Sequence, residues 1–207
     1  MAVSKGIPAE RVAEAVRAGH QLFGENRVQE AEDKAPAVAS VVGSAPRWHL
    51  VGHLQSNKAR RAVGLFDVIQ SVDSLELARR LDGLAAEVGP PLQVYLQVNV
   101  DRDPAKTGFS HEALRLDLGA LLDLASLDVR GLMTVGALVA EPEDARSTFR
   151  ELAALSAESR ERDARLGAGL SMGMSDDFEV AVEEGATCLR IGRAIFGKRR
   201  DATEPVP

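Results

Sequence analysis

Two parts of this sequence carry residue types that could do chemistry together, a lysine near the start and two glycine-containing segments near the end. Lys5 follows the short apolar run Ala2–Ser4. A lysine at the end of a buried strand is costly unless it is used, and a neutral amine can attack a carbonyl carbon to form an imine. At the ordinary lysine pKa only about 0.04% is neutral at pH 7, so this chemistry needs an apolar pocket or a neighbouring cation. The alternative is a solvated lysine.

The segments Ser171–Ser175 and Gly192–Arg193 together predict a phosphate site. Ser171 and Ser175 offer hydroxyl donors, and Gly173 lets backbone N–H groups approach an anion. Gly192-Arg193 opens a predicted helix whose free N–H groups and dipole favour negative charge. Each segment alone is typical of a simple turn. In (β/α)₈ barrels, the loops after the seventh and eighth strands commonly bind phosphate. Two such segments near the end of the chain therefore favour a phosphate-bearing ligand.

Such a site needs a scaffold, and the chain alternates short apolar segments with helical patterns from end to end. The helical stretch Ser74–Val88, for example, begins with a serine cap and repeats apolar residues at helical spacing. The predicted strands are Ala2–Ser4, Gln21–Gly24, Arg47–Val51, Phe66–Ser71, Leu92–Val100, Val129–Val135, Gly169–Met172 and Thr187–Ile191. Eight strand-then-helix units predict a (β/α)₈ barrel, with an open doubly wound sheet as the alternative.

A barrel would bring these residues together, because the carboxyl ends of its strands meet at one end and form the active sites there. The strand Leu92–Val100 adds a second indication. Its odd positions, Gln93, Tyr95, Gln97 and Asn99, are polar, and alternate residues of a strand face opposite sides. Inward polar groups are costly unless hydrogen-bonded, so they predict a network beneath the site. An exposed edge strand is the alternative.

The composition of the 207 residues excludes several other classes. The chain has 25 lysine and arginine residues and 31 aspartate and glutamate residues, a net charge of −6. This negative charge argues against a nucleic-acid binder. Cys188, the one cysteine, excludes an intrachain disulfide and is expected to be buried and inert. His49 and His53 lie on different elements without an acidic partner at metal-ligand spacing, so no metal site is predicted. No apolar run reaches the roughly 18 residues of a membrane span, and a cytoplasmic protein is expected.

Five ordered motifs resemble those of the pyridoxal phosphate homeostasis proteins, a family with an alanine-racemase-like barrel. The motifs are Ala2–Lys5, Phe23–Glu30, Trp48–Lys58, Leu170–Asp177 and Arg190–Gly197. The resemblance runs from residue 2 to about residue 198. It implies a (β/α)₈ barrel of the alanine racemase N-terminal type that binds pyridoxal 5′-phosphate.

The resemblance also implies a role for each site residue. Lys5 would carry the cofactor as a Schiff base, Asn26 would lie near it, and Arg190 would face its pyridine nitrogen. The phosphate would be held by loops that contain Ser171, Gly173, Ser175, Gly192 and Arg193. The resemblance further implies a protein that binds and buffers the cofactor, with apo-enzymes as expected partners, and that does not turn over a substrate.

Physical reasoning agrees with this lack of turnover. An arginine beside the ring nitrogen disfavours its protonation and weakens the cofactor as an electron sink. Racemisation needs a second acid/base group, and Tyr95, the chain's one tyrosine, is predicted within a strand. The alternatives are a weak racemase-type enzyme that uses pyridoxal phosphate, and a cofactor-free barrel of aldolase type with a Schiff-base lysine.

The expected organisation is one barrel over residues 1–198 and a disordered tail over residues 199–207. Members of the resembled family begin with a helix of some tens of residues, whereas Met1 stands only four residues before Lys5. We therefore expect a barrel that lacks this helix. A sequence that starts downstream of the natural first residue is the favoured explanation, and a minimal version of the family is the alternative. Without a racemase-type C-terminal domain to form the usual dimer contact, a monomer is expected.

Overall fold

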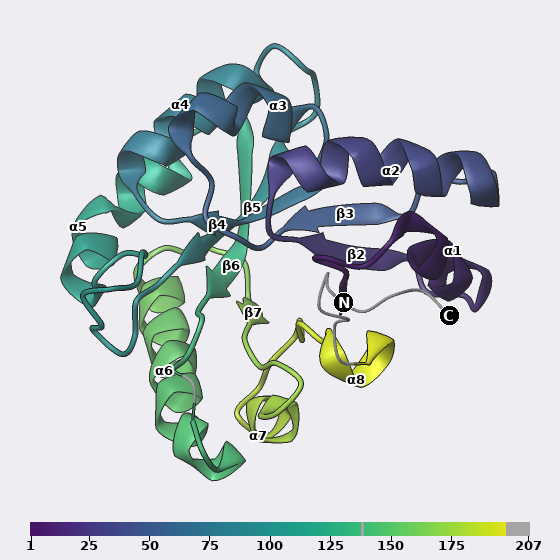
Figure 1. Ribbon diagram of the computed structural model, residues 1–207. Helices are drawn as coiled ribbons and strands as arrows, with labels where there is room; N and C mark the ends of the chain where they lie inside the picture. The colour runs from purple at the N-terminus through teal and green to yellow at the C-terminus, as the bar shows by residue number, and fades with distance from the viewer. Residues whose placement is uncertain (138, 198–207) are drawn as a thin grey trace.

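The computed structural model describes residues 1–137 and 139–197, so the predicted tail over 199–207 lies outside the described residues. Seven parallel strands form one curled sheet in the order of the chain (Figure 1). They are β1 (Ala2–Val3), β2 (Leu22–Glu25), β3 (Arg47–Leu50), β4 (Val68–Val72), β5 (Leu92–Gln97), β6 (Leu127–Met133) and β7 (Gly169–Ser171). Sequential order is typical of a barrel, whereas a doubly wound sheet reverses its order at a switch point.

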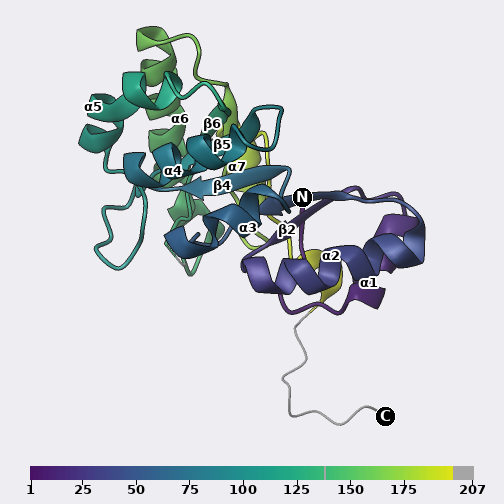
Figure 2. The same cartoon turned by 90° about the horizontal axis from the view of Figure 1, so that it is seen from above.

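Helices connect the strands and lie outside the sheet (Figures 1 and 2). They are α1 (Ala9–Arg17), α2 (Val28–Val42), α3 (Ala59–Val63), α4 (Leu75–Ala85), α5 (His111–Leu122), α6 (Arg146–Arg162), α7 (Phe178–Glu183) and α8 (Arg193–Phe196). Short 3₁₀ turns at Ser56–Lys58 and Pro142–Ala145 precede α3 and α6. Within the described residues, none of these helices has the length and apolar character that a bilayer span requires.

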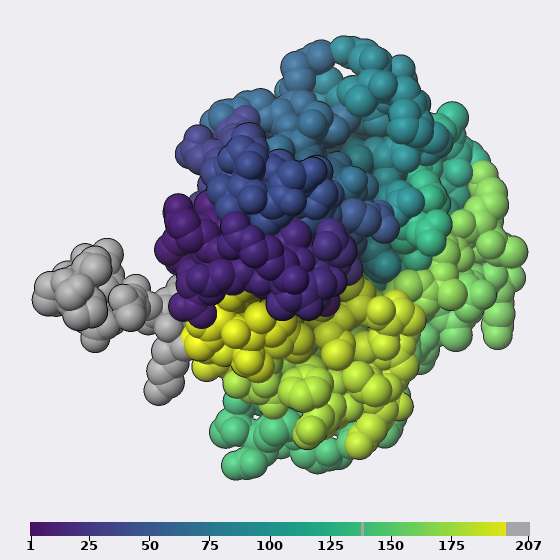
Figure 3. All heavy atoms as spheres, turned by 90° about the vertical axis from the view of Figure 1, so that its right-hand side faces the viewer, coloured from purple at the N-terminus to yellow at the C-terminus, as the bar shows by residue number. Residues whose placement is uncertain are grey.

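The eighth predicted strand, Thr187–Ile191, is an irregular segment that nevertheless closes the ring. It forms isolated parallel bridges from Cys188 to Ser171 in β7 and from Ile191 to Ala2 in β1. The Ile191 carbonyl accepts a hydrogen bond of 2.8 Å from the N–H of Val3. In Figure 3 the N-terminal residues, in purple, accordingly pack directly against the C-terminal residues, in yellow. The predicted barrel is therefore confirmed, with an irregular eighth position.

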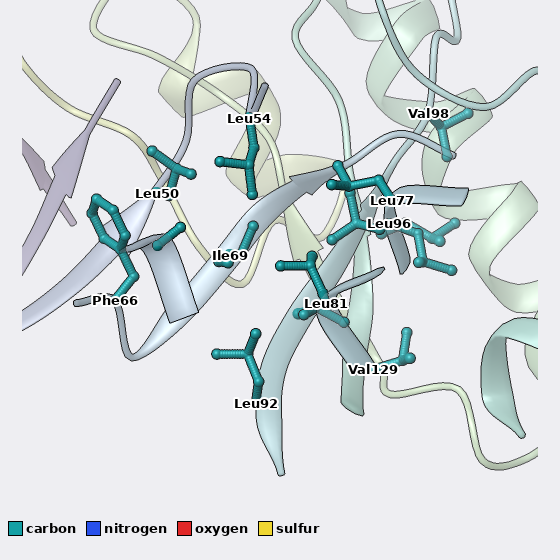
Figure 4. Close-up of a cluster of buried hydrophobic side chains, with 14 of the residues drawn as sticks. Leu50, Leu54, Phe66, Ile69, Leu77, Leu81, Leu92, Leu96, Val98 and Val129 are labelled. Atoms are coloured by element: carbon teal, nitrogen blue, oxygen red, sulfur yellow. The ribbon is translucent and has the colours of Figure 1, made fainter. Parts of the chain in front are cut away.

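The core lies between the strands and their covering helices, as α4 illustrates. Ser74 caps this helix by accepting a hydrogen bond from the N–H of Leu77. Figure 4 shows Leu77 and Leu81 beside the strand residues Leu96 and Val129, all of them buried. Each such side chain contributes about 1.5–3 kcal/mol when it leaves water. This layer fixes the strand positions and hence the loops at their carboxyl ends.

Candidate ligand-binding site

A cavity of about 300 Å³ opens at the carboxyl ends of the strands. Of the eight predicted site residues, six line it, namely Lys5, Asn26, Ser175, Arg190, Gly192 and Arg193. Ile7, Val51 and Val135 supply apolar wall. The remaining two predicted residues, Ser171 and Gly173, are not among the described residues that line it. The geometry therefore places a lysine, a buried arginine and two polar loops around one space.

Lys5 occupies a tight turn immediately after β1. The N–H of Ile7 donates to the carbonyl oxygen of Ser4 over 2.9 Å, and Gly6 has a φ of 71°. A positive φ at the third position of a turn favours glycine, because other residues meet a steric penalty there. The N–H of Ser4 also donates to the carbonyl of Gly24 in β2 over 2.9 Å. The backbone of Lys5 is therefore fixed at the rim of the barrel.

Elsewhere in the cavity wall, backbone donors gather around the Ser175 hydroxyl. The N–H groups of Gly192 and Ala194 lie 3.3 and 3.4 Å from its Oγ atom. These separations exceed the usual range for strong hydrogen bonds, so both N–H groups can still donate to a closer anionic oxygen. The carboxylate of Asp177 accepts a bond of 2.6 Å from the N–H of Met174 and holds the loop in shape. This arrangement suits a phosphate group.

Gly173 shapes the same loop without lining the cavity. Its φ is 87°, and a Cβ atom there would lie only 2.5 Å from the Cβ of Ala181 in α7. The absence of a side chain therefore lets the loop pack against α7. The structure places Gly173 where it sets the position of the loop that carries Ser175.

Arg190 is a buried cation whose hydrogen bonds go to neutral oxygens. Its guanidinium donates to the Ser171 hydroxyl over 2.8 Å and to the Thr134 carbonyl over 2.6 Å. Burial lowers the pKa of Arg190 to about 10, so the side chain still carries its charge at neutral pH. A buried charge is costly without a compensating partner. The cavity should therefore favour a ligand with an electron-rich atom on the Arg190 side.

The hydrogen bonds continue from Arg190 across the barrel interior. Ser171, completely buried, donates from Oγ to Oε1 of Gln70 over 2.7 Å. The Nε2 group of Gln70 donates to Nδ1 of His49 over 2.8 Å, so the histidine carries its proton on Nε2. Sequence reasoning considered His49 only as a metal ligand and did not single out Gln70. The signal that could have found Gln70 is its place as a polar residue inside the predicted strand Phe66–Ser71.

We expect His49 to make the protein less stable in mild acid. Burial lowers the pKa of His49 to about 3, against an ordinary value near 6.5. Between these values the unfolded chain binds a proton that the folded chain does not. The free energy of unfolding should therefore fall as the pH falls through this window, by up to about 1.4 kcal/mol per pH unit from this group.

Denaturant unfolding of wild type and His49→Asn at pH 6.5 and pH 5 would measure this contribution. Asparagine keeps an acceptor for Gln70 but does not titrate, and the acidic side chains affect both proteins alike. We expect wild type to lose about 1–2 kcal/mol more than the variant between the two pH values. Equal losses would show that His49 is not held neutral.

Gln97 of β5 and Asn99 just beyond it hold the loop that follows this strand. Nε2 of Gln97 donates to the Thr107 carbonyl over 2.9 Å, and Nδ2 of Asn99 donates to the Asp103 carbonyl over 2.8 Å. The strand pairs with β4 on one side and β6 on the other, which excludes the edge-strand alternative.

One expectation about the cysteine was wrong. Cys188 is half-buried and lies in an isolated bridge, because residues 187–191 do not form a regular strand. The Gln70 amide lies 3.7 Å from its sulfur. Among residues 1–137 and 139–197, His, Cys, Asp and Glu side chains do not gather in any group of three or more that could hold a metal ion.

Comparison with known proteins gives one consistent group. The family model described as "Alanine racemase, N-terminal domain" matches residues 1–200. The "Pyridoxal phosphate homeostasis protein" of Escherichia coli K12 is 39% identical over 199 residues, which is 96% of this chain and 85% of that protein. The protein of the same name from Synechocystis is 40% identical over 199 residues, 96% of this chain and 90% of that protein.

Solved structures agree with these sequence matches. PipY of Synechococcus elongatus, solved with PLP bound, superposes with a TM-score of 0.89 at 42% identity, covering 95% of this chain and 91% of PipY. An alanine racemase of Clostridium difficile superposes with a TM-score of 0.77 at 15% identity, covering 97% of this chain and 55% of the racemase. The second likeness concerns the fold alone.

Proposed function

Because this chain belongs to the alanine racemase N-terminal domain family and, within it, to the pyridoxal phosphate homeostasis proteins, we propose that it binds pyridoxal 5′-phosphate as a Schiff base on Lys5. In this role it would store, deliver or scavenge the cofactor. The observation that carries the proposal is the gathering of Lys5, Arg190 and the Ser175 loop around one cavity. PipY, at 42% identity, was solved with PLP bound.

The donor set of the cavity fits this cofactor, which supplies an aldehyde carbon, an aromatic ring nitrogen and a phosphate. The Lys5 amine can form a C=N bond with the aldehyde, and the carbonyl oxygen leaves as water. The Ser175 hydroxyl with the N–H groups of Gly192 and Ala194 suits the phosphate. Arg190 supplies a buried cation that can face the ring nitrogen and disfavour its protonation. Asn26 lies in the same wall.

We assign the protein a binding role without robust catalysis. The charge on Arg190 weakens the bound ring as an electron sink. Tyr95, the one tyrosine of the chain, lies in β5 against Gly169 rather than in the cavity wall, and burial raises its pKa. It is therefore poorly placed to serve as the second acid/base group that racemisation needs.

The test is a visible absorption spectrum of the purified protein with added cofactor, followed by borohydride reduction and peptide mass mapping. We expect a yellow protein with a pyridoxyl group on Lys5. A protein that takes up no cofactor, or one labelled at another lysine, would contradict the proposal. A colourless protein that forms a reducible adduct with another carbonyl compound would favour the aldolase-type barrel.

A racemisation assay, which measures conversion of one amino-acid enantiomer into the other, decides between a cofactor carrier and an enzyme. We expect no racemisation of any amino acid above the rate of free pyridoxal phosphate. Robust racemisation by the loaded protein would instead establish the enzyme alternative. We further propose a monomer in the cytoplasm whose partners are apo-enzymes that require the cofactor, and sedimentation equilibrium would test the oligomeric state.

A further inference from the structure

Three charged side chains from β2 and α2 lie directly behind the turn that carries Lys5. The Lys34 ammonium donates to Oε1 of Glu25, to Oε1 of Glu30 and to the carbonyl oxygen of Ser4, each over 2.7 Å. Ser4 adds a bond of 2.7 Å from its Oγ to Glu25. All three protons of the ammonium are thereby used. Lys34 and Glu25 are buried, and Glu30 is partly exposed.

These contacts hold both peptide groups that flank Lys5. Lys34 binds the carbonyl oxygen of Ser4, in the peptide group before Lys5. Glu30 accepts a hydrogen bond of 2.5 Å from the N–H of Gly6, in the peptide group after Lys5. Glu30 and Lys34 are four residues apart and ion-paired on α2, so they act from neighbouring turns of one helix. The backbone of Lys5 is therefore clamped from α2 on both sides.

Stability alone is a poor explanation for this cluster. Burying a group of charges costs desolvation energy, and apolar replacements of similar volume are often neutral or stabilising. The second oxygen of Glu25, Oε2, is also buried without a hydrogen-bond partner among the residues that the structure describes. Buried polar groups without partners are costly. An arrangement that tolerates this cost while binding the peptide groups of Lys5 points to a positioning role.

We propose that Glu30 and Lys34 are positioning residues. By holding the Lys5 backbone, they fix the place on the cavity rim from which the Lys5 side chain extends. They would thereby determine how fast the Lys5 amine captures an aldehyde. This inference rests on the proposed function, and it assigns the role to two residues outside the cavity wall. The Lys34 ammonium is buried behind the turn and uses its three hydrogens on Ser4, Glu25 and Glu30, so Lys34 itself is not placed to form the imine.

Glu30→Ala tests the clamp, with Glu32→Ala as its matched control. Both glutamates lie on α2 with 28% of the side chain exposed, and each pairs with a basic residue. Glu32 pairs with Arg61 and does not hold the Lys5 turn. We expect Glu30→Ala to capture pyridoxal phosphate about tenfold more slowly, because a misplaced reacting group loses rate steeply. Glu32→Ala should react at the wild-type rate.

Rescue by a conservative variant separates positioning from general damage. Glu30→Gln keeps an oxygen that can accept from the N–H of Gly6, so it should recover most of the capture rate. Glu30→Asp keeps the charge but is one methylene too short, so it should remain slow. If Glu30→Ala does not fold, Glu30→Asp replaces it with the same expected loss. Equal rates for Glu30→Asp, Glu30→Gln and wild type would overturn the proposal.

A second readout needs no cofactor. Competitive labelling with acetic anhydride across a pH series, followed by peptide mass mapping, reports the reactivity of each lysine, with Lys58 as the internal reference. We expect the pH profile of Lys5 relative to Lys58 to change in Glu30→Ala and to stay unchanged in Glu32→Ala. An unchanged profile in Glu30→Ala would contradict the clamp. If wild type failed to bind pyridoxal phosphate, the proposed function would fall, while this labelling would still decide the positioning role.

Discussion

Replacing Lys5 by alanine should abolish the covalent capture of pyridoxal phosphate and leave weak, reversible binding. The amine is removed, so no C=N bond can form, whereas the Ser175 hydroxyl and the N–H groups of Gly192 and Ala194 are untouched. Two charge-assisted hydrogen bonds of about 1.5–3 kcal/mol each would supply about 3–6 kcal/mol. That free energy corresponds to a Kd between about 0.04 and 6 mM.

Equilibrium dialysis measures the reversible binding, and borohydride reduction with mass mapping measures the covalent link. Lys58→Ala is the control, because Lys58 follows β3 and does not line the cavity that holds Lys5. This control should incorporate the cofactor as wild type does. Complete loss of binding in Lys5→Ala would show that the phosphate loops contribute less than their geometry indicates. A pyridoxyl group on another lysine of that variant would contradict the assignment of Lys5.

The fold could be predicted because its signals are local. Alternating apolar strands and helical stretches with caps such as Ser74 recur along the chain, and each depends on neighbours in sequence. The eighth strand was the exception. Residues 187–191 are apolar enough for a strand, but the N–H groups of Thr187 and Cys188 both donate to the Leu170 carbonyl. The segment therefore departs from regular pairing, and no local signal marks this.

The gathering of residues around the cavity was predictable for a related reason. In a barrel the carboxyl end of every strand lies on one side, so the position of a residue after its strand suffices to place it there. Whether a side chain faces the cavity or the interior depends on register, which the sequence does not specify. Ser171 ends β7 and points to Gln70, 101 residues away, whereas Ser175 in the following loop lines the cavity.

The charged groups behind Lys5 were harder to predict. Glu25 and Glu30 belong to a recognisable motif, but charged residues are usually solvated, and composition gives no reason to bury them. Their role depends on the ion pair with Lys34, which needs α2 to lie against the turn after β1. Such a contact joins residues up to 30 positions apart. It becomes visible only when the three elements are placed in space.

Gly52→Ala should both destabilise the protein and weaken its hold on the cofactor. Gly52 follows β3, and a Cβ atom there would lie 2.3 Å from the carbonyl oxygen of Asn26 and 2.8 Å from its Cα atom. These are backbone atoms, so the ends of β2 and β3 must separate to admit a methyl group. Overpacking of this kind costs about 1–3 kcal/mol. For a chain of this size the melting temperature should fall by roughly 3–10 °C.

The effect on binding follows because Asn26 lies in the cavity wall and directly follows Glu25, which the Lys34 ammonium holds. A shift of this segment therefore disturbs the wall and the support of Lys5 together. Thermal unfolding and the rate of cofactor capture should both change in Gly52→Ala.

Gly83→Ala is the control, since Gly83 lies within α4 with open space around its Cβ position. Alanine there should raise stability by about 0.5–1 kcal/mol and leave capture unchanged. A Gly52→Ala protein that melts and captures the cofactor like wild type would show that the two strand ends are not in tight contact.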